Sequence, residues 1–278
     1  MADIGGFLKQ TAREAIGDNL TGEAAKVAYY FFLSLFPLIL VLFALTGLLG
    51  GDAAFRWIMG RLETALPADT ATYLERFVRQ VTDQPRPGVL SIGILLTLWS
   101  ASNVFTAFAD GLNTMYDVEE TRSWWKKRLV AIALLVATAV LIVGSATAIL
   151  AGGAIGRALG VGALWNALVL PIAFVLLTLG LWLIYYFLPA VESRRRKGRI
   201  LVGAIFGALV WIGATYLFRL YVANFGSYGE TYGFVGAVIV LLLWLYLSAL
   251  AVLLGGEVAA VLESRARPAG RAERRAAA

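Results

Sequence analysis

The sequence predicts an all-α polytopic membrane protein, a six-transmembrane-helix bundle with short amphipathic helices at the N-terminus and in the first external loop. Two observations predict this fold class. Hydrophobic residues make up 60% of the 278 residues, and the mean hydropathy is +0.77, which is too apolar for a soluble domain. Six apolar runs also cover more than half of the chain, and each exceeds the roughly 20 residues that a helix needs to cross the hydrocarbon layer.

The six runs are predicted to be helical because a membrane span must satisfy its backbone hydrogen bonds internally. They also lack the alternating pattern of barrel strands. Pro37 and the pair Gly255-Gly256 are expected to bend or thin their helices. The predicted spans form a membrane domain over 24–262 and cover approximately 24–49, 88–112, 129–151, 165–188, 200–223 and 233–262.

The segment before the first span, 1–23, is predicted to be a cytoplasmic amphipathic helix lying on the membrane surface. The first apolar run is too long for the core of a signal peptide, so we interpret it as a retained span. A solvated tail is the alternative for the segment before it. Its apolar stripe consists of Ile4, Phe7, Leu8, Thr11, Ala15 and Ile16.

Two further parts are expected outside the membrane. The external loop 51–87 contains two amphipathic patterns separated by Leu66-Pro67, which predict two short helices. The tail 263–278 is rich in Arg and Ala and is predicted to be disordered and cytoplasmic. Its positive charge is explained by attraction to anionic lipid headgroups, and no nucleic-acid partner is expected.

The positions of Lys and Arg predict the orientation. Most of them fall in the N-terminal segment, the loops 113–128 and 189–199, and the tail. The arginines of the opposite side lie mostly in the loop 51–87, where acidic residues balance them. Since positive charge favours the cytoplasmic side, both termini are predicted to be cytoplasmic in a multi-pass protein of the bacterial inner membrane.

The composition limits the chemistry. The chain contains no Cys and no His, which excludes disulfides, thiolate or imidazole metal sites, and His-dependent catalysis. The acidic residues are scattered along the sequence, and no phosphate-binding glycine loop is present. We therefore predict no catalytic residue, no metal and no cofactor, and an enzyme is not expected.

Several motifs in order resemble one family. They are the run Tyr29-Tyr30-Phe31-Phe32-Leu33-Ser34-Leu35-Phe36-Pro37, Trp99-Ser100-Ala101-Ser102-Asn103, Gly111-Leu112-Asn113-Thr114-Met115-Tyr116, Thr231-Tyr232-Gly233, Trp244-Leu245-Tyr246-Leu247-Ser248 and Gly255-Gly256-Glu257. Together they resemble the YihY/virulence factor BrkB family of bacterial inner-membrane proteins over roughly residues 20–262. The resemblance implies six membrane helices. It implies little about chemistry, since members were once labelled ribonuclease BN, others were linked to virulence, and lipid or ion transport has been suggested.

Polar residues within the spans are the candidate functional residues, because ionisable groups in hydrocarbon usually face a partner or a water-filled path. Near the cytoplasmic ends of three spans, a shared depth predicts a polar network of Lys26, Asp110 and Glu257. On the second span, three- and four-residue steps place polar residues on one helix face, and these are Ser100, Asn103, Thr106, Asp110 and Asn113. A candidate external gate consists of Arg219, Asn224 and Glu230. The structural alternative is that these charges reach the interface or fasten helices together.

Two classes of function remain open. The first is a secondary transporter or flippase-like translocator, whose amphiphilic or ionic substrate, a lipid or an exchanged cation or proton, passes the polar stripe. The second is a non-transporting scaffold that binds lipid or envelope proteins; a lipid-modifying enzyme or a ribonuclease is more remote. Membrane lipids are the expected partners. The spacing of Gly203 and Gly207 would serve close helix packing or a homo-oligomer face.

Overall fold

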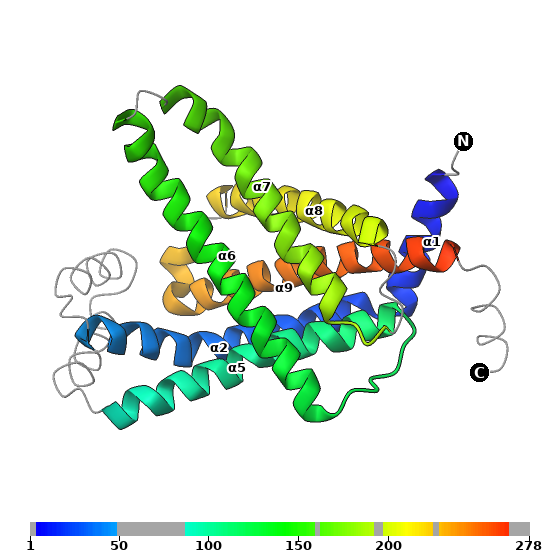
Figure 1. Cartoon of the computed structure of the whole chain (residues 1–278), viewed down its shortest axis with the longest axis horizontal. Helices are drawn as coiled ribbons and strands as arrows, with labels where there is room; N and C mark the ends of the chain where they lie inside the picture. The colour runs from blue at the N-terminus through cyan, green and yellow to red at the C-terminus, as the bar shows by residue number, and fades with distance from the viewer. Residues whose placement is uncertain (1–3, 49–86, 159–161, 192–196, 225–227, 267–278) are drawn as a thin grey trace. The chain divides into compact units, whose positions relative to one another are not determined.

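The computed structural model describes residues 4–48, 87–158, 162–191, 197–224 and 228–266, which form α-helices joined by short turns and loops. No strand occurs within these ranges. Figure 1 shows the helices in chain order: α1 (Ile4–Gly17), α2 (Leu20–Leu48), α5 (Pro87–Met115), α6 (Trp124–Ala158), α7 (Gly162–Phe187), α8 (Lys197–Asn224) and α9 (Tyr228–Arg265). The predicted external helices of the loop 51–87 and the tail from 267 lie outside the described residues.

Four stretches of the described residues are long and apolar enough to cross a membrane. They are Ile92–Met115, Ala167–Phe187, Lys197–Ala223 and Val235–Arg265. The first and third predicted spans coincide with α2 and α6, and some side chains of both helices fall outside the described set. The described part of the protein therefore contains no regular structure other than helices, several of which suit a membrane, while the count of six spans stays a prediction.

The helices run past the predicted span ends. α6 begins at Trp124 rather than at 129, and α9 continues to Arg265. Ser123 immediately precedes α6, and its carbonyl accepts the first helical hydrogen bond, from the Lys127 amide at 3.1 Å. Apolar runs mark only the part of a helix that lipid surrounds, so the polar turns beyond it are absent from a hydropathy pattern.

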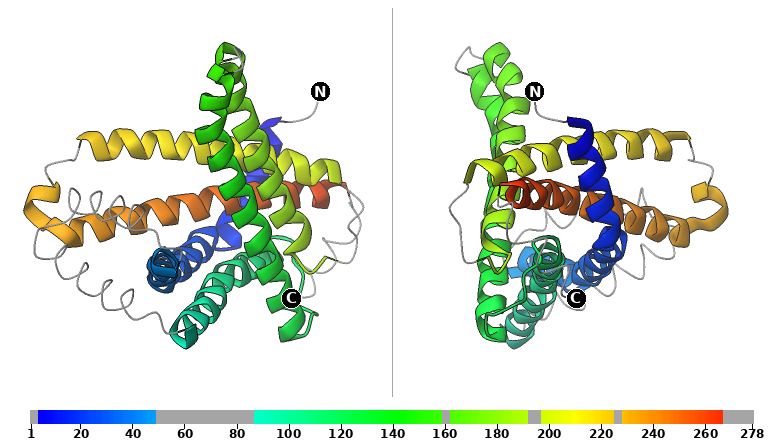
Figure 2. Two further views of the ribbon diagram at one scale, coloured as in Figure 1. Left: turned by 60° about the vertical axis from the view of Figure 1, so that its left-hand side comes forward. Right: turned by 90° about the vertical axis from the view of Figure 1, so that its right-hand side faces the viewer.

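The chain forms two compact units, each of which is described by itself. The first contains Met1–Val27, Phe105–Tyr216 and Tyr246–Ala278. Most of its fully buried large side chains are apolar or aromatic, and they include Leu112, Met115, Tyr185, Leu188, Leu253 and Val261. α6 and α7, which lie side by side along their lengths in both views of Figure 2, belong to this unit.

Close packing of α8 on α9 depends on glycines in this first unit. A Cβ atom at Gly203 would lie 2.6 Å from both the Ala259 Cβ and the Gly255 carbonyl oxygen. A Cβ atom at Gly255 would lie 2.7 Å from the Gly207 Cα. The hydroxyl of Tyr185 on α7 also donates a hydrogen bond to the Val252 carbonyl of α9. Gly203 and Gly207 therefore serve packing within the chain, one of the two roles that their spacing predicted.

The second unit consists of Ala28–Val104 and Leu217–Leu245. Two of its buried hydroxyl groups bond within their own helices. Ser34 is buried and donates to the Phe31 carbonyl at 2.7 Å, and Ser102, which is fully buried, donates to the Trp99 carbonyl at 2.8 Å. A hydroxyl group that bonds to a carbonyl of its own helix can lie in an apolar environment, because this bond satisfies its donor.

Candidate functional site

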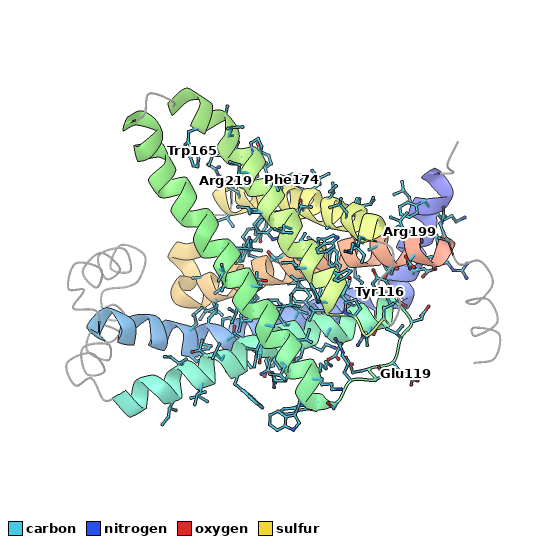
Figure 3. All side chains as sticks on the ribbon, viewed as in Figure 1. Tyr116, Glu119, Trp165, Phe174, Arg199 and Arg219 are labelled. Carbon is cyan, nitrogen blue, oxygen red and sulfur yellow. The ribbon has the colours of Figure 1, made fainter. Side chains whose placement is uncertain are left out.

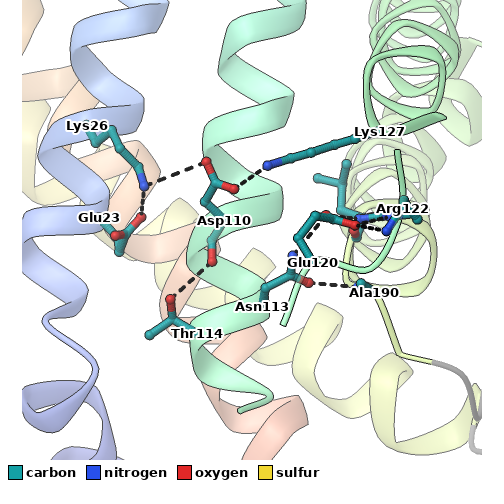
Figure 4. A network of polar contacts seen from close by, with 10 residues as sticks. Glu23, Lys26, Asp110, Asn113, Thr114, Glu120, Arg122, Lys127 and Ala190 are labelled. Atoms are coloured by element: carbon teal, nitrogen blue, oxygen red, sulfur yellow. Dashed lines mark hydrogen bonds and ion pairs between the residues drawn. The ribbon is translucent and has the colours of Figure 1, made fainter. Parts of the chain in front are cut away.

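A cluster of charges surrounds Asp110 near the end of α5, within the first unit (Figure 4). Lys127 of α6 donates a short hydrogen bond to one carboxylate oxygen of Asp110. Lys26 of α2 lies 3.9 Å from the other oxygen and forms a closer ion pair, at 2.5 Å, with Glu23. Two carboxylates thus alternate with two lysines across α2, α5 and α6. We call Glu23, Lys26, Asp110 and Lys127 the charge cluster.

The end of α5 shapes the region beside this cluster. The Val118 amide donates to the Asn113 carbonyl and the Asp117 amide to the Thr114 carbonyl, both at 3.0 Å. Asp117 has a positive φ of 49°, so this is a Schellman ending with an aspartate in the left-handed position. The turn brings the following loop back along the helix that it leaves.

Glu120 and Arg122 of that loop attach it to α7. Arg122 donates to both carboxylate oxygens of Glu120 at 2.7 Å, through Nε and Nη2. The same guanidinium donates to the Leu188 carbonyl at 2.6 Å and to the Phe187 carbonyl at 3.3 Å. The carbonyls at a helix C-terminus lack partners within the helix and carry partial negative charge, so a cation stabilises this end of α7.

Asn113 completes the connection. Its amide nitrogen donates to Glu120 at 3.1 Å, and its amide oxygen accepts from the Ala190 backbone at 2.7 Å. Because Arg122 stabilises the carboxylate, the pKa of Glu120 is lowered to about 2, with a smaller contribution from Asn113. Glu120 therefore remains ionised near neutral pH.

An open cavity of about 350 Å³ lies between the Asp110 turn of α5 and this loop. Its lining is polar and acidic and consists of Asp110, Asn113, Thr114, Asp117, Val118, Glu119 and Glu120. The cavity begins at the last two members of the stripe predicted on α5. A positively charged or polar group would be favoured there on electrostatic grounds.

Glu257, the third member of the predicted network, lies in a different group of charges. Its side chain is fully buried, and its carboxylate is within 4.8 Å of those of Glu14 and Asp18. Three carboxylates at this spacing could share one hard cation. Nearby, burial raises the pKa of the Tyr116 hydroxyl, and the charges of Glu263 and Glu257 raise it further.

The other predicted site residues are distributed along α5, α8 and α9. Ser100 and Asn103 are half-buried on α5. Figure 3 labels Arg199 and Arg219 near the two ends of α8; Arg219 is exposed, whereas Arg199 pairs with Glu263 of α9 at 3.2 Å. The side chains of Asn224 and Glu230 lie outside the described set, so the external gate stays a prediction.

Sequence reasoning missed several members of these groups. Lys127 was assigned to the positive loop that sets orientation, although its side chain turns inward to Asp110. Glu14 and Asp18 are four residues apart, and Asp18 lies just beyond the end of α1, a spacing that places two carboxylates on one side. The spacing of Glu14 and Asp18 could be seen in the sequence. That their carboxylates lie close to the carboxylate of Glu257 depends on tertiary structure.

Comparison with known proteins identifies the family. The family model described as virulence factor BrkB matches residues 11–278. The chain belongs to the virulence factor BrkB family. Within this family, the ribonuclease-like protein YfkH of Bacillus subtilis is 34% identical over 267 residues, which cover 93% of this chain and 96% of the relative.

Other relatives of this BrkB-family protein are named as membrane proteins. UPF0761 membrane proteins of Tolumonas auensis and Aeromonas salmonicida are 27% and 28% identical. They cover 88% and 90% of this chain and 81% and 87% of their own lengths. No solved structure matches the chain. With its apolar helices, the protein is an integral membrane protein of a bacterial family.

Proposed function

We propose that this BrkB-family protein is a secondary transporter or flippase-like translocator of the bacterial inner membrane. Its substrate would be an amphiphilic or ionic molecule, either a lipid or an exchanged cation or proton. The observation that carries the proposal is the acidic cavity at the end of α5, which is lined by Asp110 and Asn113 of the predicted polar stripe. A transport path needs a polar opening of this kind at one end.

The charge cluster would allow the carboxylate of Asp110, which lines the cavity, to exchange one cation for another. Asp110 is 45% exposed although two lysines reach it, so an incoming cation could compete for its carboxylate. Lys26 already has Glu23 as a second partner at 2.5 Å and would not be left alone if it moved away. The Lys26–Asp110 pair is partly exposed and its groups lie 3.9 Å apart, so it contributes little to stability and its exchange would cost little free energy. Opening and closing through these pairs is the proposed mechanism at this end.

The proposed external gate is Arg219 with Asn224 and Glu230. A guanidinium with five donors could hold an anionic headgroup or carboxylate while Glu230 competes for it. Arg219 is exposed on α8, as this role requires.

Cysteine labelling tests the path, because the chain has no native Cys. Ser100→Cys, Asn103→Cys and Thr106→Cys should react with a small water-soluble thiol reagent in the reconstituted protein. Ile92→Cys and Leu95→Cys, whose native side chains are 60% and 65% exposed in the region predicted to face lipid, should not. Ser102→Cys is the matched control, since Ser102 is fully buried on the same helix. Protection of all three stripe positions in every condition would contradict a path.

Transport itself is tested in liposomes that contain the purified protein. Lipid scrambling and proton-coupled cation flux should be measured in parallel, with Asp110→Asn as the path variant and Lys126→Gln, a change of an exposed side chain in the first turn of α6, as the control. Activity in one assay that Asp110→Asn reduces would support a translocator and identify its substrate class. If a correctly folded protein shows neither lipid scrambling nor cation flux, the non-transporting scaffold would be favoured.

A ribonuclease role is the alternative that the name of the Bacillus subtilis relative, a ribonuclease-like protein, raises. This chain has no His to act as a general base. Glu257, which belongs to the one carboxylate group of metal-binding spacing in the described residues, is fully buried. An RNA phosphate could not reach that side chain in this conformation, so the translocator is the better-supported proposal.

A further inference from the structure

α1 presents two different faces. Its inner face is fixed to the end of α9: Arg265 donates to the Gln10 side chain at 2.7 Å, and its guanidinium lies 5.2 Å from the centre of the Phe7 ring. Thr11 and Glu14 on this face are buried. The direction in which α1 points is therefore set by contacts within the first unit.

The outer face of α1 combines basic and apolar side chains. Lys9, Ala12 and Arg13 are exposed, together with Leu8 at 55% and Ile16 at 82%. Steps of three and four residues place these positions on one side of a helix. The predicted apolar stripe differs from this face, because Thr11 is buried and Phe7 lies under Arg265.

The exposure of Ile16 points to lipid. At 82%, it is more exposed than Leu170 of α7, which at 76% lies in a helix able to cross a membrane. α1 is also joined to α2 by a tight corner rather than a linker. Asn19 has a positive φ of 50°, and its carbonyl accepts from the Gly22 and Glu23 amides at the start of α2. α1 thus lies next to the beginning of a helix that is predicted to span the membrane.

The charge of this face selects the kind of lipid. Both of its ionisable residues, Lys9 and Arg13, are cations, while Glu14, the only acidic residue of α1, is turned inward. Apolar side chains that enter the interface beside cations that meet headgroups are typical of helices that bind anionic bilayers.

We infer that the outer face of α1, formed by Leu8, Lys9, Ala12, Arg13 and Ile16, is a binding surface for anionic phospholipid. Leu8 and Ile16 enter the acyl boundary, and Lys9 and Arg13 bind headgroup phosphates. The surface does not depend on transport and would serve a scaffold equally well.

A nitroxide attached at Ile16→Cys in the full-length, reconstituted protein tests this surface. Its accessibility to molecular oxygen, which concentrates in lipid, is compared with that to a water-soluble nickel chelate. Vesicles are made of phosphatidylcholine alone or of phosphatidylcholine mixed with phosphatidylglycerol. In the mixed vesicles, the label should favour oxygen, and added salt should weaken that preference.

The charge variants make the test specific. Lys9→Gln and Arg13→Gln should each lower the ratio of lipid-bound to water-exposed label roughly fivefold in the mixed vesicles. Lys126→Gln, which removes an exposed cation outside α1, should leave the ratio unchanged. Circular dichroism and the melting temperature report whether the variants fold.

Three results would overturn the inference. A label that faces water in both vesicle types would show that no lipid covers the surface. A label that enters lipid equally with and without phosphatidylglycerol would remove the anionic headgroup from the proposal. Occlusion from both reagents would mean that protein, such as a second copy of the chain, covers the face instead.

Discussion

At the residue scale, the side chain of Arg122 joins the loop between α5 and α6 to the end of α7. It binds both oxygens of Glu120 and two carbonyls at the end of α7. Arg122→Gln should lower the free energy of unfolding by about 1.5–3 kcal/mol, the range for hydrogen bonds to charged groups. Arg122→Lys keeps the charge but not the planar fork, so it should recover only part of this stability. Thermal unfolding in detergent measures both, and equal stability of Arg122→Gln and the wild type would show that the contacts are dispensable.

The pKa of Glu120 makes the same contact dependent on pH. The folded-state pKa is about 2, below the ordinary value of 4.5, so ionised Glu120 stabilises the folded protein fully above pH 4.5. This contribution is lost as the pH falls from about 4.5 toward 2. The difference in melting temperature between the wild type and Glu120→Gln should therefore be largest above about pH 5 and shrink below it. A difference that stays constant down to about pH 3 would contradict the assignment.

Asp110 should be coupled more strongly to Lys127 than to Lys26. Lys127 is only 18% exposed and contacts the carboxylate directly, whereas Lys26 is 35% exposed, 3.9 Å away and paired with Glu23. Double-mutant cycles with Asp110→Asn, Lys127→Gln and Lys26→Gln should give a coupling free energy of about 1 kcal/mol for the first pair and less for the second. The reverse order, or strict additivity in both cycles, would argue against the charge cluster.

At the element scale, the contact of α8 with α9 sets a strict limit on side-chain size. Gly203→Ala should destabilise the protein by about 1–3 kcal/mol, since the new Cβ would meet Ala259 and the Gly255 carbonyl at 2.6 Å. Gly213→Ala is the matched change on the same helix, with open space around its Cβ. It should be neutral or stabilising by up to about 1 kcal/mol, because alanine favours helix. Comparable melting temperatures for the two variants would show that α8 and α9 pack differently.

The helices themselves were predictable from sequence, but the partners of their charged ends were not. Long apolar runs gave the positions of α5, α7, α8 and α9 to within a few residues, because membrane insertion depends on local composition. The pairing of Lys26 with Asp110 followed from shared depth, and the two groups lie 3.9 Å apart. Depth in the membrane wrongly grouped Glu257 with Lys26 and Asp110. The position of a residue along a span determines neither which helices lie next to it nor which way its side chain points. Lys127 and Glu14 were missed for the same reason.

At the scale of the whole molecule, the distribution of Lys and Arg predicts that both termini and the 194–199 cluster are cytoplasmic. Topology reporters fused after Arg199 and at the C-terminus should read cytoplasmic, and one inserted near Asp69 should read external. The charge cluster and the acidic cavity would then open to the cytoplasm. An external signal from the 199 fusion would invert this orientation and, with it, the direction assigned to the proposed path.

The bond between Arg122 and the end of α7 has a consequence for biosynthesis. Its partners are 65 and 66 residues away in the chain, so it cannot form until α6 and α7 have both left the ribosome. Until then, the guanidinium stays hydrated ahead of α6, where a cation opposes translocation of the loop. The bond then closes the base of the α6–α7 hairpin once both helices are complete. Arrested nascent chains should therefore acquire this bond only when their length passes Leu188 and the exit tunnel beyond it.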